Sequence, residues 1–347
     1  MTFRDFMELA LYHPTHGYYC RPRMDIGKEG DFYTAANVHQ IFGDTLAAKM
    51  LELWKSMGVS GPPTFIEIGA GAGQTAKDII TAIRKGGESD NGLRYIIIEK
   101  SPSMAAKQRE TLSEFSSHVE WTTIEALVAD PVTAVVLQVE VIDAFPVHRV
   151  IKKAGELHEI FVDVTDARLV DKLGPPSGPE LEDYIRRYAA DLPEECEAEV
   201  NLDALAWLGS LAAALERGFV ITIDYGMPAR ELYSGRQPGG TLVCYNKHKL
   251  VNNPYEHIGE QDITAHVNFT ALIDKGKELG LGVVSMENQA NFLINSGILD
   301  ALTALEKELE SEAQKFKARA AVKRLVFPQG MGEVFRVLVQ EVKQAEG

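Results

Sequence analysis

The amino-acid sequence predicts an α/β protein with a parallel, doubly wound sheet, and three features indicate this class. Short apolar runs alternate with longer stretches whose apolar residues recur at helical spacing. The run at 133–139 is apolar enough for a strand buried on both faces, which is typical of parallel sheets. A Gly-rich turn joins the first strand of the expected sheet directly to a helix.

The composition is that of a globular protein. The 347 residues are 45% hydrophobic and 24% charged, which suits about two domains of ordinary size or one domain with insertions. There are 35 Lys and Arg residues against 50 Asp and Glu residues, a formal net charge of −15. Because nucleic acids and anionic lipids are bound through clustered basic residues, this balance argues against a broad surface for either ligand.

The chain shows no pattern typical of export, membrane insertion or structural metal binding. The stretch MTFRDFMELALYHP lacks the continuous apolar segment of a signal peptide, and no window approaches 18 apolar residues. We therefore expect a soluble, cytoplasmic protein without membrane insertion. Cys20, Cys196 and Cys244 lie far apart and form no zinc-binding pattern, so we expect neither a disulfide framework nor a metal.

Residues 1–60 predict a helical lead-in or lid ahead of a main domain over 61–347. Apolar residues recur at helical spacing over 3–11, and the stretch HPTHGYY then ends that helix. A longer amphipathic helix is expected from 41 to about Gly58.

The main domain alternates strands with helices. The strand TFIEIG leads into the helix GAGQTAKDIITAIRKGG, and the alternation continues along the chain. Further strands are expected at 93–98, 119–121, 133–139, 219–226, 281–286 and 334–342, and further helices at 103–115, 269–279 and 290–323. The stretch EKELESEAQKFKARAAVKR mixes charges at i,i+4 spacing and predicts one helix with a solvated face.

Two insertions interrupt this alternation, at about 148–215 and 227–268. Residues 148–164 predict two strands joined at an Ala-Gly turn, and the Pro- and Gly-rich KLGPPSGPE follows them. Helices at 180–190 and 203–216 complete this inserted α/β subdomain. The second insertion is rich in polar residues and predicts a loop-rich segment.

The turn EIGAGAG at 67–73 is the most informative stretch of the chain. Residues without a Cβ let a ligand approach the backbone closely, and the following helix directs its partially positive N-terminus at that ligand. A dinucleotide-binding turn has the spacing G-x-G-x-x-G/A, but here the third glycine is Gly73, and Gln74 occupies the expected position. This spacing counts against an NAD(P)-dependent oxidoreductase, which is the weaker alternative.

Two acidic residues near this turn indicate the chemistry of its ligand. Glu67 precedes Gly69 by two residues, where it would repel a pyrophosphate but attract the ammonium group of S-adenosylmethionine. Glu99 ends the second strand, where an acid commonly accepts hydrogen bonds from ribose hydroxyls. We therefore expect S-adenosyl-L-methionine as the cofactor, bound by Glu67, Gly69, Gly71, Gly73 and Glu99.

The ends of the third and fourth strands should open onto the same crevice. At the third strand, either Trp121 or the stretch 122–124 could flank the adenine, and Trp121 fits an ordinary core residue equally well. At the fourth strand, Gln138, Glu140 and Asp143 should face or nearly face the methyl donor. Carboxylates there can accept a proton from a nucleophile or bind a guanidinium. The alternative is that Asp143 caps a helix and Glu140 lies at the surface.

Taken together, eleven stretches resemble the MidA-like family of methyltransferases. The matching stretches are FRDFMELALYHPTHGYY, GDFYTA with IFGDTLA, FIEIGAGAGQTAKDI, YIIIEKSPSM, EVIDAFPV, FVITIDYG, GGTLVCYNKH, DITAHVNF, QANFLINSGI and MGEVFRVL. They span nearly the whole chain. The resemblance implies a Rossmann-like class I methyltransferase sheet with additional subdomains. Mitochondrial members of the family act in respiratory complex I assembly as protein arginine methyltransferases.

The resemblance also implies roles for residues at matching positions. Glu67 with the three glycines of the turn corresponds to the methyl-donor site, and Glu99 corresponds to the ribose acid. Gly30, Asp31 and Thr34 of GDFYTA correspond to a segment that closes over that site.

The end of the fourth strand matches the catalytic motif of the family, with Glu140 and Asp143 as its acids. The family pattern has Asn before the first acid, where this chain has Val139. An amide role would therefore be lost or be taken over by Gln138, which we count among the cofactor-binding residues. The stretch NVHQ also replaces the usual Pro-Glu-containing stretch after GDFYTA.

Polar residues beyond the fifth strand are expected to form a substrate-binding surface. They are Asp224, Tyr225, His248, Asp262 and His266. Isolated histidines are often structural residues, and Asp262 fits a turn or cap residue equally well. The spacing of His248, Asp262 and His266 is undistinguished for a metal site, so none is expected.

The sequence and the resemblance together predict an S-adenosylmethionine-dependent methyltransferase. The expected substrate is an arginine of a partner protein, such as a respiratory complex I subunit, and no nucleic-acid partner is expected. An alternative keeps the donor site but gives the protein the role of an assembly factor or binding protein with little catalysis.

Overall fold

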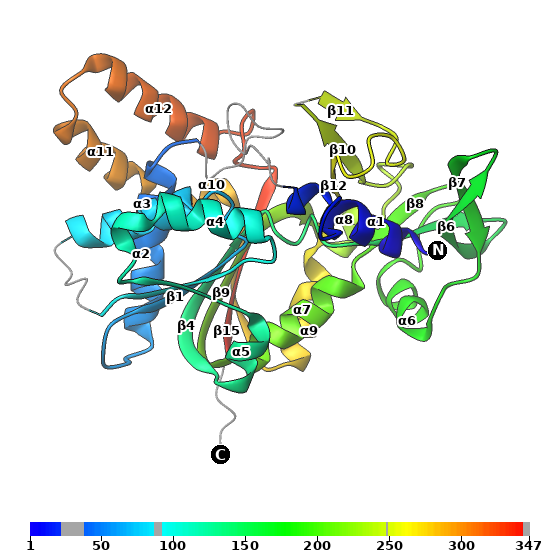
Figure 1. Ribbon diagram of the computed structural model, residues 1–347, viewed down its shortest axis with the longest axis horizontal. Helices are drawn as coiled ribbons and strands as arrows, with labels where there is room; N and C mark the ends of the chain where they lie inside the picture. The colour runs from blue at the N-terminus through cyan, green and yellow to red at the C-terminus, as the bar shows by residue number, and fades with distance from the viewer. Residues whose placement is uncertain (22–37, 87–91, 248, 343–347) are drawn as a thin grey trace.

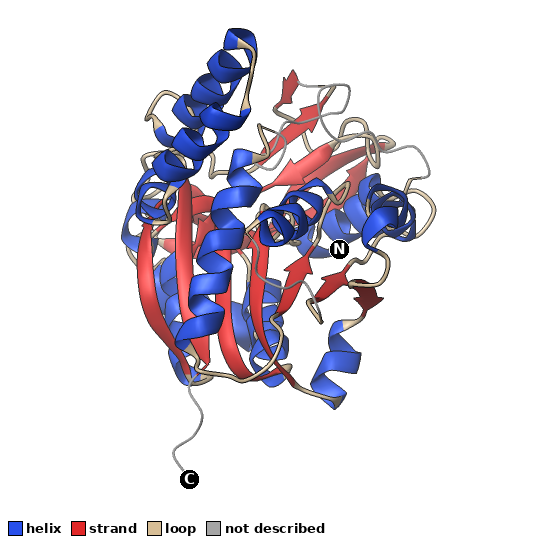
Figure 2. Ribbon diagram, turned by 90° about the vertical axis from the view of Figure 1, so that its left-hand side faces the viewer, coloured by secondary structure: helices blue, strands red, loops and turns tan. Residues whose placement is uncertain are grey.

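The computed structural model describes residues 1–21, 38–86, 92–247 and 249–342. Within these ranges the chain forms a main sheet with helices on both faces, and two smaller sheets (Figure 1; Figure 2). Of the residues singled out in the sequence, Gly30, Asp31, Thr34 and His248 lie outside the described residues. None of the helices in the described ranges has the length and apolar character needed to cross a bilayer.

The main sheet confirms the predicted doubly wound architecture. Its strand order is β14-β15-β9-β4-β1-β2-β3, and β15 runs antiparallel to both of its neighbours. The strands are β1 (Thr64–Ile68), β2 (Arg94–Ile98), β3 (Val119–Thr122), β4 (Val132–Val139), β9 (Leu215–Met227), β14 (Leu281–Asn288) and β15 (Phe335–Val342), with the short β13 (Val267–Asn268) beside β9. Strands β2 and β3 lie on one side of β1, whereas β4 lies on its other side. The strand order therefore reverses between β1 and β4, and ligands bind at such a point in open α/β sheets.

Helices cover both faces of this sheet. Successive side chains of a strand point to opposite faces, and here both faces carry apolar side chains that need covering. Phe65 and Val135 belong to the core on one face, whereas Ile66 and Val136 belong to the core on the other. The first face packs against α2 (Ile41–Ser56), α3 (Gln74–Lys85), α10 (Gln289–Asn295), α11 (Ile298–Glu308) and α12 (Glu312–Val326). The second face packs against α5 (Ile124–Ala129), α7 (Leu202–Ala213) and α9 (Phe269–Glu278).

Two further antiparallel sheets lie in the regions predicted as insertions. The larger has the order β7-β6-β5-β8, and the smaller has the order β11-β10-β12. Their strands are β5 (His148–Lys153), β6 (Glu156–Thr165), β7 (Arg168–Gly174), β8 (Glu197–Val200), β10 (Val243–Asn246), β11 (Lys249–Val251) and β12 (Asp262–Thr264), with α6 (Pro179–Tyr188) and α8 (Ala229–Leu232) nearby. Residues 227–268 are therefore more ordered than the predicted loop-rich segment.

The two predicted helices of the lead-in pack in different places. The first is α1 (Phe3–Tyr12), which shares a core with the short helix η1 (Tyr18–Cys20) and with Ile263 of β12. The second is α2, which contacts α3 and belongs to the core of the main sheet. Only α1 therefore lies near the ends of the strands that open toward the predicted site (Figure 1).

Three local predictions differ from the structure. The sequence analysis missed α5, whose start is fixed by the Thr123 side chain accepting a hydrogen bond from the Ala126 backbone N–H. It also missed β7 and β8, which have too little apolar alternation to be read as strands. The prediction of one continuous helix over the charged stretch was wrong. The chain leaves the helical conformation at Leu309, and Ser311 caps a new helix, α12.

Candidate active site

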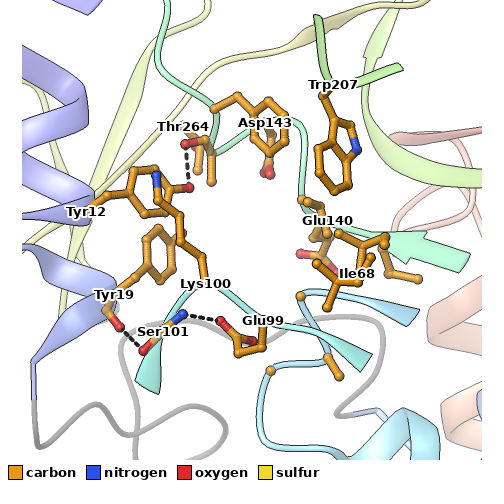
Figure 3. A pocket seen from close by; sticks show the side chains of 18 of the residues that line it. Tyr12, Tyr19, Ile68, Glu99, Lys100, Ser101, Glu140, Asp143, Trp207 and Thr264 are labelled. Atoms are coloured by element: carbon orange, nitrogen blue, oxygen red, sulfur yellow. Dashed lines mark hydrogen bonds between the residues drawn. The ribbon is translucent and has the colours of Figure 1, made fainter. Parts of the chain in front are cut away.

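A cavity of about 1210 Å³ opens at the carboxyl ends of β1, β2, β3 and β4. Its glycine-turn side consists of residues 67–72, 74–75, 98–101 and 122–125. Its tyrosine side carries the aromatic, acidic and imidazole groups Tyr12, Tyr19, Asp143, Tyr225, Tyr245, Asp262 and His266. Glu140 and Trp207 face Tyr12 and Tyr19 across the open space (Figure 3). The cavity thus brings together residues that lie more than 200 positions apart in the chain.

The Gly-rich turn has the backbone conformation that requires glycine. Gly69, Gly71 and Gly73 have φ values of +61°, +52° and +83°, in the left-handed region. A Cβ at Gly69 would lie 3.3 Å from the Cγ2 atom of Val141, on the loop after β4. The turn therefore brings the backbone close to the fourth strand, and α3 begins directly after it at Gln74.

Glu67 is a buried carboxylate at the base of this turn. Its side chain is 4% exposed, and its Oε2 atom accepts a 2.7 Å hydrogen bond from the Tyr95 hydroxyl. Burial raises the pKa of Glu67 to about 7. A cation entering the cavity would stabilise the ionised form of Glu67, so this site favours a ligand with an ammonium group.

Glu99 lies at the end of β2 and is held from two sides. Its Oε1 atom accepts a 2.8 Å hydrogen bond from the Ser101 backbone N–H, and its Oε2 atom accepts one of 2.8 Å from the Gln108 amide. Burial raises the pKa of Glu99, and these two hydrogen bonds oppose that effect. Gln108 was not predicted as a site residue, because a glutamine within a polar helix belongs to no motif that indicates a function.

At the end of β3, the structure distinguishes between Trp121 and the stretch 122–124 as the predicted neighbour of the adenine. Thr122, Thr123 and Ile124 line the cavity, whereas Trp121 does not. The indole N–H of Trp121 instead donates a 3.0 Å hydrogen bond to Gln108 Oε1, and the Arg109 guanidinium lies over the indole ring. The stretch 122–124 is therefore the candidate adenine contact, and Trp121 is part of the support behind the site.

The loop after β4 places the two predicted acids on the cavity. Glu140 lines the cavity and has a φ of +53°, an uncommon conformation for a residue with a side chain. Asp143 lines it as well and is 6% exposed. Burial raises the pKa of Asp143 well above its usual value, and the nearby Asp224, Glu140 and Asp262 carboxylates raise it further. Of the open alternatives, the structure thus favours acids that face the cavity.

Asp224 supports this loop and does not line the cavity, so the prediction that it binds substrate needs correction. Its Oδ2 atom accepts hydrogen bonds from the backbone N–H groups of Val141, Ile142 and Asp143, at 3.2, 2.9 and 3.3 Å. Its Oδ1 atom accepts another from the Tyr225 N–H at 2.8 Å. The side chain is 1% exposed, and burial raises the pKa of Asp224 to about 7.

Gln138 also differs from its prediction as a cofactor-binding residue. It is buried inside the sheet and does not line the cavity. Its amide donates a 2.7 Å hydrogen bond to the Thr222 hydroxyl and accepts one of 3.0 Å from the Trp207 indole N–H. Because side chains alternate along a strand, Gln138 and Val139 point to opposite faces, and Val139 lines the cavity.

Two tyrosines of the N-terminal segment complete the cavity, and the sequence analysis missed both. Tyr12 and Tyr19 are stacked with 5.5 Å between ring centroids. The Tyr12 hydroxyl donates to the Ala144 carbonyl at 3.0 Å, and the Tyr19 hydroxyl donates to Asp262 Oδ1 at 2.6 Å. Their approach to the loop after β4 is a long-range contact that local spacing does not reveal.

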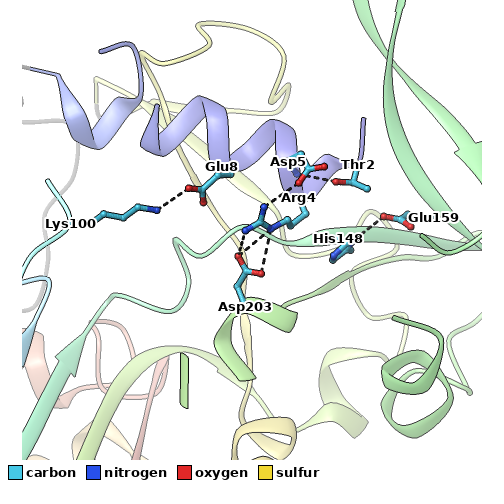
Figure 4. Close-up of polar contacts among 8 residues, drawn as sticks. All are labelled: Thr2, Arg4, Asp5, Glu8, Lys100, His148, Glu159 and Asp203. Atoms are coloured by element: carbon cyan, nitrogen blue, oxygen red, sulfur yellow. Dashed lines mark hydrogen bonds and ion pairs between the residues drawn. The ribbon is translucent and has the colours of Figure 1, made fainter. Parts of the chain in front are cut away.

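Salt bridges connect α1 to the rest of the cavity. Arg4 forms a 2.8 Å ion pair with Asp203 of α7, and Glu8 forms one of 2.9 Å with Lys100, next to Glu99 (Figure 4). The Lys100 ammonium also lies 4.0 Å from the centroid of the Tyr12 ring. These contacts link α1 to both ends of the site.

Of the later residues predicted to bind substrate, Tyr225, Asp262 and His266 line the cavity. The rings of Tyr225 and His266 are stacked at 6.4 Å between centroids, and burial lowers the pKa of His266. The buried Nδ1 atom of His266 has no hydrogen-bond partner among the described residues. Within the described ranges, no three His, Cys, Asp or Glu side chains are arranged to hold a metal ion.

The residues of the glycine-turn side fit S-adenosyl-L-methionine. Gly69 and Gly71 of the turn line the cavity without a Cβ, Glu67 offers a buried carboxylate to an ammonium group, and Glu99 follows β2 at the cavity. A pyrophosphate at this turn would meet the charge of Glu67 without a compensating basic side chain on the turn itself. The site therefore suits the methyl donor better than a dinucleotide.

Comparisons with known proteins agree with this geometry. A sequence model of the family described as "Putative S-adenosyl-L-methionine-dependent methyltransferase" matches residues 45–286. The chain is similar to two solved structures from Burkholderia thailandensis, each with a TM-score of 0.86. One, bound to S-adenosyl-homocysteine, is 31% identical and covers 100% of this chain and 89% of that one. The other, a native structure, is 33% identical and covers 100% and 88%. The class I methyltransferase-like fold is thus confirmed.

Curated relatives are more distant. The mitochondrial protein arginine methyltransferase NDUFAF7 of Homo sapiens is 27% identical over 364 residues, which cover 96% of this chain and 78% of the relative. Its homolog in Drosophila melanogaster is 29% identical over 294 residues, which cover 76% of this chain. That match spans 64% of the Drosophila protein, less than two thirds of its length.

Proposed function

Because the chain belongs to this family of S-adenosyl-L-methionine-dependent methyltransferases and has that donor as its cofactor, we propose that it N-methylates an arginine of a partner protein. The curated relatives are named as protein arginine methyltransferases, which supports an arginine as the substrate. A respiratory complex I subunit is the partner that the resemblance of the sequence suggests.

The single observation that carries the proposal is the buried carboxylate of Asp143 in the same cavity as the donor turn. Asp143 lies on the tyrosine side of the cavity with Asp262, and Glu140 faces this side across the open space, so both add negative charge near Asp143. Burial and the neighbouring carboxylates raise the pKa of Asp143, so a cation bound beside it would stabilise its ionised form. A guanidinium is such a cation and can donate bidentate hydrogen bonds to a carboxylate.

The chain's own residues would then perform the transfer mainly by positioning. When bound, S-adenosyl-L-methionine supplies an electrophilic methyl group on a sulfonium. Glu67 and Glu99 hold the two ends of the donor, and Glu140 and Asp143 orient the acceptor nitrogen toward the methyl carbon, at about 3–3.5 Å. A carboxylate of this pair accepts the proton that the nitrogen loses.

Mass spectrometry of protein arginines tests the proposal. We expect a methylated arginine in cells with the wild-type protein that is absent from cells with the Glu140→Gln variant. The matched control is Glu110→Gln, the same change at an exposed position of α4 (Pro102–Thr111), which should keep the modification. Identical arginine methylation in all three would contradict the proposed transfer.

A second candidate function is an assembly factor that binds the donor but transfers little. The observation that favours it is Val139, which lines the cavity where the family pattern places an asparagine. Under this alternative, the Glu140→Gln variant should support assembly of the partner complex as well as the wild type does. A variant that has lost assembly together with arginine methylation would exclude it.

A further inference from the structure

Gln108 of α4 is completely buried behind the donor site and does not line the cavity. Its amide nitrogen donates two hydrogen bonds, one of 2.9 Å to the Gly71 carbonyl and one of 2.8 Å to Glu99 Oε2. Its amide oxygen accepts a 3.0 Å hydrogen bond from the Trp121 indole N–H. One side chain therefore connects the Gly-rich turn, the end of β2 and the end of β3.

The partners of this amide allow it only one orientation. An indole N–H can only donate, whereas a backbone carbonyl and an ionised carboxylate can only accept. A flipped amide would direct its oxygen at two acceptors and its nitrogen at a donor. Trp121 therefore keeps the amide N–H groups of Gln108 directed at Gly71 and Glu99.

Gly73 lies where α4 approaches the turn. It has a left-handed φ of +83°, a conformation that favours glycine. A Cβ at that position would lie 3.4 Å from the Cα atom of Gln108, at the near limit of van der Waals contact. The third glycine therefore sets the bend of the turn in close contact with the backbone of α4.

The hydrogen bond to Glu99 fixes that carboxylate from the side opposite Ser101. With Oε1 on the Ser101 N–H and Oε2 on the Gln108 amide, the plane of the carboxylate is defined where Glu99 lines the cavity. A carboxylate that is oriented before the ligand arrives loses less side-chain entropy on binding. Both hydrogen bonds also favour its ionised form, the better acceptor.

We propose that Gln108 is a positioning residue of the donor site, which aims Glu99 at the ribose hydroxyls of the methyl donor and ties it to the Gly-rich turn. Its effect is exerted through Glu99 and Gly71, since it does not itself line the cavity. The inference rests on the same donor site as the proposed function, but it does not depend on the identity of the acceptor.

The experiment measures by calorimetry the affinity for S-adenosyl-homocysteine and for its 2′,3′-dideoxy analogue, which lacks the ribose hydroxyls. Wild type should bind the analogue about 10–100-fold more weakly, as expected for losing hydrogen bonds to a charged group. In Gln108→Met, affinity for S-adenosyl-homocysteine should fall by about the same factor. Affinity for the analogue should change little, so that the preference for the hydroxyls is nearly lost.

A matched control is Gln289→Met. Gln289 is also completely buried and donates to a backbone carbonyl, that of Leu325, and neither residue lines the cavity. This variant should lose stability in thermal unfolding but keep the wild-type preference for S-adenosyl-homocysteine over the analogue. Gln108→Glu provides a second variant, because it keeps an oxygen for Trp121 but replaces both donations with a carboxylate; it should also lose the preference.

The outcomes separate the inference from the proposed function. If both Gln108 variants weaken the two ligands equally, Gln108 is only a structural residue, and the inference is overturned. Wild-type affinity in either Gln108 variant would overturn it as well. If the wild type binds neither ligand, the donor site itself fails, and the proposed function fails with it.

Discussion

The two sides of the cavity are built in different ways. The glycine-turn side comes from consecutive βα units between residues 67 and 125, and its turn is held by the left-handed backbone of Gly69 and Gly71. The tyrosine side assembles side chains from α1, the loop after β4, β9 and the smaller sheets, between Tyr12 and His266. Local structure therefore forms the first side, and long-range contacts form the second.

This difference suggests that one side of the cavity binds the donor and that the other determines methyl transfer. A backbone turn inside a sheet can bind the same donor in many proteins, because its shape depends on few side chains. The tyrosine side depends on individual hydrogen bonds, such as those from Tyr19 to Asp262 and from the Ala265 N–H to the Asp143 carbonyl. We therefore expect changes on the tyrosine side to affect methyl transfer and changes on the glycine-turn side to affect donor affinity.

The largest difference between the effect on methyl transfer and the effect on donor affinity is expected for the Asp143→Asn variant. A neutral amide cannot accept the proton or balance the charge of a guanidinium, so methyl transfer should fall by about 10²–10⁴-fold. Affinity for S-adenosyl-homocysteine should stay near the wild-type value. Arginine methylation measured by mass spectrometry and donor binding measured by calorimetry would check both halves. An equal loss of donor affinity would break the comparison, because it would place Asp143 on the donor.

Asp224→Ala should show that the tyrosine side depends on its supports. The change leaves the N–H groups of 141–143 without their buried acceptor, and the free energy of unfolding should fall by about 3 kcal/mol. Denaturant unfolding measures this loss. Asp224→Asn is the control, since its amide oxygen can still accept, and it should lose less. Equal losses in the two variants would show that the hydrogen bonds to this loop are not the cause.

The pH dependence of donor binding tests Glu67 on the glycine-turn side. Burial raises the pKa of Glu67 to about 7, so below that pH most of the free protein carries a neutral Glu67. Affinity for S-adenosyl-homocysteine, an ammonium at these pH values, should therefore rise on the order of 10-fold between pH 5.5 and 7, with release of a proton. Calorimetry in buffers of different ionisation enthalpy measures both quantities.

Glu67→Gln is the matching variant for this pH profile. Its donor affinity should depend much less on pH, and the remaining dependence should come from Glu99, whose pKa burial also raises. A pH profile that is as steep as that of the wild type would show that Glu67 does not contact the donor ammonium.

The smallest effect is expected at the attachment of α1. Arg4 and Asp203 each expose 31% of their side chains, and pairs of this kind contribute less than about 1 kcal/mol. Arg4→Gln should therefore change thermal unfolding only slightly and leave donor affinity unchanged. A double charge reversal, Arg4→Asp with Asp203→Arg, should restore the wild-type stability. A loss of donor affinity in Arg4→Gln would show that α1 is coupled more tightly to the glycine-turn side.

The sequence predicted most of the main sheet because its elements have strong local signals. Apolar runs such as 133–139 and the helical spacing over 3–11 correspond to β4 and α1. The errors lie where local signals are weak or mixed. The short strands β7 and β8 lack alternation, and the charged stretch after α11 contains a capping serine, Ser311, that breaks the predicted helix.

The candidate site was predicted unevenly for the same reason. The positions of Glu67, Gly69, Gly71 and Glu99 follow from a motif and from strand ends, and these residues line the cavity as expected, whereas Gly73, also predicted to bind the cofactor, does not line it. Gln138 and Asp224 lie on neighbouring strands at the predicted level but point away from the cavity, a matter of side-chain direction. Their actual partners could not be read from spacing alone.

The sequence by itself determined the alternating fold, the glycine turn and the acids beside it, because backbone conformation and apolar periodicity are local properties. Only the tertiary structure decided that Tyr12 and Tyr19 close the cavity, that Asp224 supports the catalytic loop, and that Gln108 joins the turn to Glu99. These roles depend on hydrogen bonds between residues far apart in the chain. Such contacts form only when packing brings their elements together, so no local pattern encodes them.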